Sequence, residues 1–195
     1  MYHGENKYHT YVKKIGYGIN IMYIVRNKLN QTDLIKIYHT IIQPHIDYCI
    51  TIWGYAPQSH VHRVQRLQNR MIRLITGNYE FTTSPSTLLS KFKIMNVIQR
   101  RDYFMGIMMY KCIHDLAPTY LSDRIDYVRD HNVVNTRNAA SDMFYVPRPR
   151  VEQFRQSFQY VGPALYNTIP KHVTTSSSLF EFKNKLKNNY FNVPC

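Results

Sequence analysis

Four arginines spaced along one predicted helix are the residues of this sequence best suited to binding an anion. Arg63, Arg66, Arg70 and Arg73 recur every three or four residues, which places them within an arc of about 80° on an α-helix. No acidic residue lies between Asp47 and Glu80 to neutralise them. Forked guanidinium donors match phosphate oxygens, so the row predicts salt-dependent contacts with a phosphate backbone. A solvated helix face is the alternative interpretation.

The predicted helix that carries these arginines runs from Ser59 to Thr76 and ends at Gly77, a favoured residue for a helix C-cap. Its apolar residues fall in an adjacent arc of about 100°, which predicts a buried side: Val64, Leu67, Met71, Leu74 and Ile75. A further helix, capped by Ser90 or Asn96 and reaching about His114, carries Arg100 and Arg101. These two arginines are expected to extend the basic surface.

Composition supports an anionic partner and a folded chain. The 195 residues hold 25 Lys and Arg against 12 Asp and Glu, a formal charge of +13, with 44% hydrophobic residues. Between Ala56 and Lys111 there are nine basic and two acidic residues. Such an excess favours nucleic acid, RNA or DNA, as the partner. The apolar content suffices for one sizeable core, or one core with a small appended module.

Other site chemistries find little support in the sequence. Cys49, Cys112 and Cys195 are an odd number at wide spacings, which indicates neither a disulfide framework nor a zinc module and favours a reducing, intracellular setting, nucleus or cytoplasm. Asp123, Asp126 and Asp130 are interpreted as a solvated face rather than a metal site. No metal or cofactor is expected. No apolar run approaches the roughly 18 residues of a spanning helix, so a soluble protein without a membrane contact is expected.

Periodicity predicts a mainly α fold. Apolar residues at helical spacing indicate a helix over 12–23 and a buried helix from Gln31 or Thr32 to Pro44, with residues 46–52 favoured as helix over strand. Met143–Pro149 suggests a short edge strand, and Ser178–Tyr190 a terminal amphipathic helix. The expected organisation is an N-terminal tail at 1–9, a helical thumb-like domain at 10–131, and a small mixed module with short strands at 132–195.

Several blocks, in order along the chain, resemble the region downstream of the palm in LINE-type, jockey-like non-LTR retrotransposon reverse transcriptases. The most specific block is the run 34–48 followed by Ile52-Trp53-Gly54, which is similar to the family's thumb signature of a buried helix, Pro, Tyr and then Trp-Gly. The arginine-bearing helix resembles the family's next helix. Weaker matches cover the remaining blocks: Arg101–Phe104, Met109–Lys111, Ala117–Leu121, Gly162–Pro170 and Ser178–Leu186. Tyr166 stands where the family usually has Trp.

The resemblance implies a helical thumb-like bundle that grips template and primer, an RNA–DNA hybrid, and packs against the palm and fingers of a parent RNA-directed DNA polymerase. Polymerases of this kind hold two metal ions with aspartates, normally including an adjacent pair. This sequence has no adjacent acidic pair. The chain by itself is therefore expected to lack the catalytic palm and to be inactive in nucleotide transfer. Because Met1 lies inside what resembles a thumb, a truncated chain is expected.

Three hypotheses follow for function. The first is a polymerase fragment that binds nucleic-acid backbone through Arg63, Arg66, Arg70 and Arg73, helped by Arg100 and Arg101. The second is a stand-alone module that binds RNA or DNA by charge and by stacking on some of its 17 tyrosines. The third is a helical scaffold or protein-interaction domain with an incidental basic face.

Overall fold

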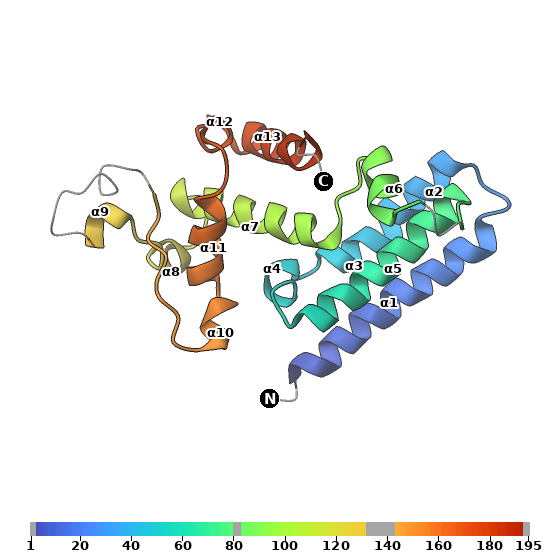
Figure 1. Cartoon of the computed structure of the whole chain (residues 1–195), viewed down its shortest axis with the longest axis horizontal. Coiled ribbons are helices and arrows are strands. Elements are labelled where there is room, and N and C mark those ends of the chain that lie inside the picture. Colours follow the sequence, from blue (N-terminus) through green and yellow to red (C-terminus); the bar gives the residue numbers. More distant parts are fainter. Residues whose placement is uncertain (1–2, 80–82, 132–142, 193–195) are drawn as a thin grey trace. The chain divides into compact units, whose positions relative to one another are not determined.

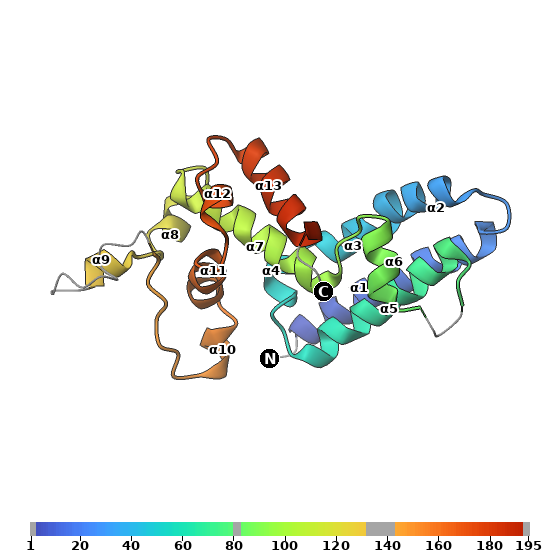
Figure 2. The same ribbon diagram turned by 45° about the horizontal axis from the view of Figure 1, so that its top comes forward.

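The structure is a computed structural model that describes residues 3–79, 83–131 and 143–192. It is mainly helical, as the periodicity predicted, and its chain divides into two compact units, Met1–Arg101 and Asp102–Cys195. Figures 1 and 2 show the helices of each unit. The helices that begin in the first unit are α1 (His3–Val25), α2 (Gln31–Ile37), the π-helix η1 (Tyr38–Ile42), α3 (Gln43–Asp47), α4 (Ile50–Trp53), α5 (Gln58–Thr76), α6 (Pro85–Lys91) and α7 (Val97–Ile113). Those of the second are α8 (Thr119–Ser122), α9 (Val128–His131), α10 (Glu152–Arg155), α11 (Phe158–Tyr166), α12 (Lys171–Thr174) and α13 (Leu179–Asn192).

The first unit is built on two long helices, α1 and α5, which lie side by side in both views (Figures 1 and 2). Their facing sides supply much of the core, because residues three and four apart on a helix share a face. On α1 this face is Val12, Ile15, Ile19 and Met22. On α5 it is Val61, Val64, Met71, Ile72, Leu74 and Ile75.

The chain passes through Pro44 without leaving the helical conformation. A proline inside a helix has no N–H to donate, and its ring meets the carbonyl one turn earlier. The helix widens into the π-helix η1 immediately before α3, where Pro44 lies in the first turn. A wider turn relieves the crowding and lets the buried side of this segment continue through Tyr38, Ile42 and Ile46. The prediction of helix over residues 46–52 is confirmed by α3 and α4 except at Tyr48 and Cys49, where the chain turns between the two helices and Cys49 adopts φ 54°.

Helix α5 ends where the sequence predicted. Gly77 adopts φ +65°, the left-handed conformation that glycine reaches without the steric cost met by other residues. The next long helix, α7, begins with a reciprocal cap in which the Asn96 side chain accepts from the Gln99 N–H at 2.8 Å. In return the Gln99 side chain accepts from the Asn96 N–H at 3.0 Å. Of the two predicted caps, Asn96 is thus the one that opens α7.

A buried glutamine joins α5 to two other segments of the first unit. The Gln68 side chain is fully buried, and its Nε2 donates to the Tyr38 hydroxyl at 3.0 Å and to the Met95 carbonyl at 2.9 Å. Burial raises the pKa of Tyr38 to about 12, so the phenol remains protonated. Satisfied polar groups of this kind specify one arrangement of the core, since breaking one bond would leave a buried donor or acceptor unpaired.

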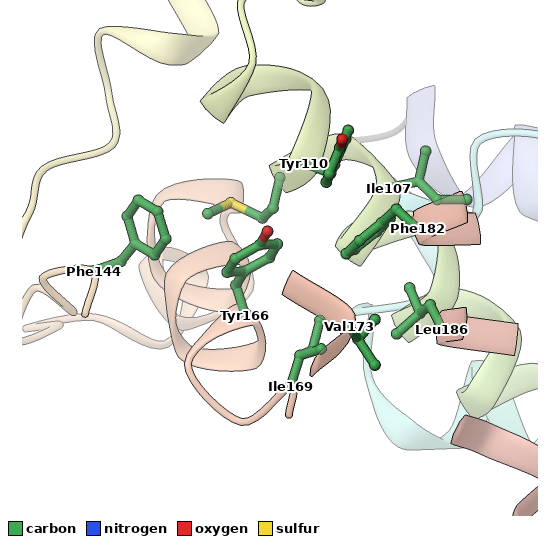
Figure 3. Packing of buried hydrophobic residues seen from close by; sticks show 9 residues of the cluster. Ile107, Tyr110, Phe144, Tyr166, Ile169, Val173, Phe182 and Leu186 are labelled. Atoms are coloured by element: carbon green, nitrogen blue, oxygen red, sulfur yellow. The ribbon is translucent and has the colours of Figure 1, made fainter. Parts of the chain in front are cut away.

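The second unit has its own aromatic core (Figure 3). Tyr166, Phe182 and Leu186 gather there with Ile107 and Tyr110. The rings of Tyr110 and Phe182 stack with centroids 4.4 Å apart, and the Tyr110 hydroxyl donates to the buried Ser176 carbonyl at 3.1 Å. The predicted terminal amphipathic helix is α13, which directs Phe182 and Leu186 into this core.

The segment Met143–Pro149 differs from the prediction. In place of an edge strand over Met143–Pro149, the described residues show one isolated antiparallel bridge between Tyr127 and Phe144. Asn167 holds this segment, because its side chain accepts from the Phe144 N–H at 2.9 Å and donates to the Phe144 carbonyl at 2.8 Å. The amide side chain thereby occupies the positions that a partner strand would have used. The predicted domain ranges 1–9, 10–131 and 132–195 remain a prediction, and residues 132–142 lie outside the described residues.

Candidate nucleic-acid interface

Three of the four arginines on α5 form an open basic row. Arg63, Arg66 and Arg70 are exposed, on the side of α5 that turns away from the buried residues. Among the described residues, no acidic side chain pairs with any of the three. We call these three residues the α5 arginine row. Their guanidinium groups are available to phosphate oxygens, which they can bind through two parallel hydrogen bonds.

Arg73, the fourth predicted member, lies differently. Its side chain is partly buried, and Nη2 donates to the Thr83 carbonyl at 3.2 Å. Arg73 therefore has a role in holding the chain that leads into α6. It lies at the end of the row, on the last turn of α5.

Arg100 makes a two-pronged ion pair with Asp47. Nη2 of Arg100 is 2.6 Å from Oδ2 of Asp47, and Nε contacts the other carboxylate oxygen. The exposed fractions of the two side chains are only 16% and 22%. The pair links the first turn of α7 to the end of α3, and this contact occupies the planar fork that would otherwise face a phosphate.

Arg101 is also engaged within the first unit. Its Nη1 donates to the Gly54 carbonyl at 3.2 Å, and its guanidinium carbon lies 4.3 Å from the centre of the Tyr55 ring. Arginine commonly stacks in this way on aromatic faces. The structure thus brings Arg63, Arg66 and Arg70 together, and it directs Arg100 and Arg101 to contacts with α3 and with the end of α4.

The first unit carries most of the positive charge. It contains 14 of the 25 basic residues and four of the 12 acidic residues. The two acidic side chains described there are both paired, Asp33 with Lys36 at 2.9 Å and Asp47 with Arg100. Neither reaches the α5 arginine row. The electrostatic potential around α5 is therefore set by cations, which raises the local concentration of any polyanion.

A further cation, Lys13 on α1, borders the same surface. Lys13 and Lys14 are exposed on α1, the helix that lies beside α5. A hollow of about 420 Å³ is bordered by both helices, and Lys13 and Arg70 line it. The signal available in the sequence was weak, because two adjacent lysines are common on any solvated helix.

Comparison with known proteins gives two related matches. Over 72 residues, or 37% of the chain, the sequence is 39% identical to the probable RNA-directed DNA polymerase from transposon X-element of Drosophila melanogaster. Over 73 residues, also 37% of the chain, it is 32% identical to the RNA-directed DNA polymerase from mobile element jockey of Drosophila funebris. Part of this chain resembles the polymerases of non-LTR transposons. The predicted resemblance to this family is confirmed over that part.

The similarity to the non-LTR polymerases is limited in extent. The chain spans about 8% of the length of the curated relatives it matches. No family model matches the chain. No solved structure matches it either.

Two further findings concern metal binding and membrane-spanning helices. In the part of the chain that the structure describes, no three His, Cys, Asp or Glu side chains gather to hold a metal ion. Within the same residues no helix is both long and apolar enough to cross a membrane.

Proposed function

We propose that this chain is a fragment of a non-LTR retrotransposon reverse transcriptase and that its first unit binds the sugar–phosphate backbone of template and primer. The similarity to two transposon polymerases supports the family. The α5 arginine row carries the proposed contact, because three exposed guanidinium groups lie on one helix face with no described acid to pair with them. Such contacts position nucleic acid without reading its sequence.

The predicted site residues have different roles in nucleic-acid binding. Arg63, Arg66 and Arg70 contact phosphate oxygens, and Arg73 adds positive charge at the end of the row. Arg100 and Arg101 hold the start of α7 against α3 and the end of α4, and so they help to keep the helices of the first unit in place. An RNA–DNA hybrid is the proposed ligand, and the palm and fingers of a parent polymerase are the proposed neighbours of this unit. The chain alone transfers no nucleotide in this proposal, since its sequence contains no adjacent acidic pair.

Binding across a salt series tests this function. The purified full chain is titrated against a labelled RNA–DNA hybrid, alongside a variant with Arg63, Arg66 and Arg70 changed to Gln. Each lost phosphate contact removes roughly 0.7 to 0.9 from the slope of log affinity against log salt. The triple variant should therefore bind more weakly at low salt and show a slope shallower by roughly two to three.

A matched control removes the same charge from the second unit. Arg150, Lys171 and Lys187 are exposed there, and changing them to Gln should leave the slope nearly unchanged. Equal losses in both variants would show that net charge alone, and not the α5 arginine row, drives binding. A folded wild-type chain that binds no hybrid at low salt would favour the helical scaffold instead, in which the basic face is incidental.

A further inference from the structure

The hollow between α1 and α5 combines an exposed aromatic ring with cations. Its volume is about 420 Å³, and the residues that matter here are Lys13, Gly16, Tyr17 and Asn20 from α1 with Leu67 and Arg70 from α5. Tyr17 exposes 70% of its surface, although the large side chain of tyrosine is more often packed against neighbours. Leu67, predicted as a core residue, is only partly buried because it borders the hollow.

Helix geometry explains why these groups converge. Lys13, Tyr17 and Asn20 fall within an arc of about 60° on α1, so they form one strip along the side of the helix. Gly16 lies between this strip and the buried face. A Cβ atom built at Gly16 would meet nothing within 4 Å, so the absence of a side chain leaves open space beside Tyr17.

We propose that this hollow receives an unpaired base of single-stranded nucleic acid, stacked on Tyr17, with the flanking phosphates on Lys13 and Arg70. The inference rests on the proposed function, since Arg70 is shared with the α5 arginine row. It adds a single-stranded stretch beside the hybrid to the proposed ligand, because a base inside a duplex has both faces covered and only an unpaired base can offer one to a protein ring.

The composition of the hollow favours this occupant over others. Every charged group that lines it is a cation, which suits a polyanion. Asn20 adds an amide that can donate to or accept from the edge of any base, so recognition would be tolerant of sequence. Leu67 supplies an apolar wall. An acidic peptide would share the cations but would leave the face of Tyr17 without a stacking partner.

Two oligonucleotides of equal charge separate stacking from backbone binding. A labelled oligothymidylate and an abasic strand of the same length are titrated with the full chain, and with Tyr17→Ala, Tyr17→Phe and Gly16→Leu variants. The Tyr17→Ala variant loses one base stack, so it should bind oligothymidylate roughly 5- to 150-fold more weakly than wild type. Tyr17→Phe keeps the ring and should stay near wild type. Gly16→Leu fills the open space and should weaken oligothymidylate binding as Tyr17→Ala does.

The abasic strand is the internal control. Its affinity should be the same for wild type and for Tyr17→Ala, since only the phosphates bind. The salt slope of Tyr17→Ala should also match wild type, because no ionic contact is removed. Because Tyr17 is largely exposed, the variant should keep the wild-type unfolding temperature.

Failure of this inference is distinct from failure of the proposed function. If Tyr17→Ala binds oligothymidylate as tightly as wild type while the Arg63, Arg66 and Arg70 variant loses affinity, stacking is excluded and backbone binding stands. If that arginine variant binds as wild type does, the proposed function itself is wrong. Displacement of oligothymidylate by polyglutamate of equal charge at equal concentration would overturn the preference for a base.

Discussion

Arg70 and Arg100 are chemically identical, yet their neighbours assign them different tasks. Arg70 is exposed beside a hollow lined by a second cation, whereas Arg100 is held by both oxygens of the Asp47 carboxylate. A guanidinium group that already binds a carboxylate through its planar fork has to break that contact before it can bind phosphate. At the scale of the residue, the local partner therefore decides which arginines are available to nucleic acid.

The Asp47–Arg100 pair should contribute measurably to stability. Changing Asp47 to Asn leaves the partly buried guanidinium without its counter-charge, and we expect a loss of about 1–3 kcal/mol, less than for a fully buried pair. Urea unfolding followed by circular dichroism measures this loss. Asp33→Asn is the control, because the Asp33–Lys36 pair is exposed and should change stability by less than about 1 kcal/mol. Equal effects of the two changes would contradict the structural role given to Arg100.

At the scale of the element, α13 shows how a terminal helix is both started and anchored. Ser178 accepts from the Glu181 N–H at 3.2 Å, and the Glu181 carboxylate accepts from the Ser177 N–H at 2.9 Å. This reciprocal arrangement satisfies donors that a helix start leaves free. One turn further along, Lys185 lies 2.7 Å from the same carboxylate. Capping sets where α13 begins, and its apolar face sets where it packs.

The start of α13 should weaken in acid. Hydrogen bonds from Lys185 and Ser177 lower the pKa of Glu181 from its ordinary value of 4.5 to about 2. Because the pKa is lower in the folded state, the carboxylate stabilises the fold above pH 4.5, and this contribution is lost as the pH falls towards 2. The unfolding temperatures of wild type and Glu181→Gln should differ near neutral pH and converge in acid. A gap that is independent of pH would exclude this role for the carboxylate.

Two phenylalanines on α13 offer a matched test of its packing. Phe182 is fully buried in the aromatic core, whereas Phe180 exposes 76% of its surface. Phe182→Ala should cost about 3–5 kcal/mol, through lost burial and the cavity left beside Tyr110. Phe180→Ala should stay within about 0.5 kcal/mol of wild type. Thermal or urea unfolding of both variants measures the difference, and a similar cost for the two would mean that α13 packs by a different face.

At the scale of the whole chain, charge is divided unequally between the two units. The first unit has 14 basic and four acidic residues, whereas the second has 11 basic and eight acidic residues. The second unit is therefore close to neutral, and several of its aromatic residues pack in its own core, whereas Tyr120 and Phe180 are exposed. This division assigns nucleic-acid binding to the first unit in our proposal.

The unequal charge predicts how strongly the chain and its variants bind a polyanion. Heparin, a polyanion without bases, should elute the wild-type chain at higher salt than the Arg63, Arg66 and Arg70 to Gln variant, because the local field around α5 is reduced. The variant with Arg150, Lys171 and Lys187 changed to Gln loses the same charge and should elute closer to wild type. Elution that depends on net charge alone, with both variants shifted equally, would argue against a localised basic surface.

The sequence by itself determined the features that depend on neighbours within a few turns. The helical periods, the end of α5 at Gly77 and the spacing of the arginines all follow from local backbone and side-chain chemistry. The choice of Asn96 over Ser90 as the cap of α7 came from the structure. The similarity to transposon polymerases was also readable from the order of its motifs.

Only the tertiary structure decided which of the predicted arginines remain accessible. Arg100 meets Asp47 across 53 residues of chain, and Arg101 meets Gly54 across 47, distances along the sequence over which periodicity carries no information. The strip of Lys13, Tyr17 and Asn20 likewise becomes part of a surface only because α1 packs beside α5. Helical period specifies the direction of each side chain from its own axis, whereas the packing of one helix on another decides what that side chain meets.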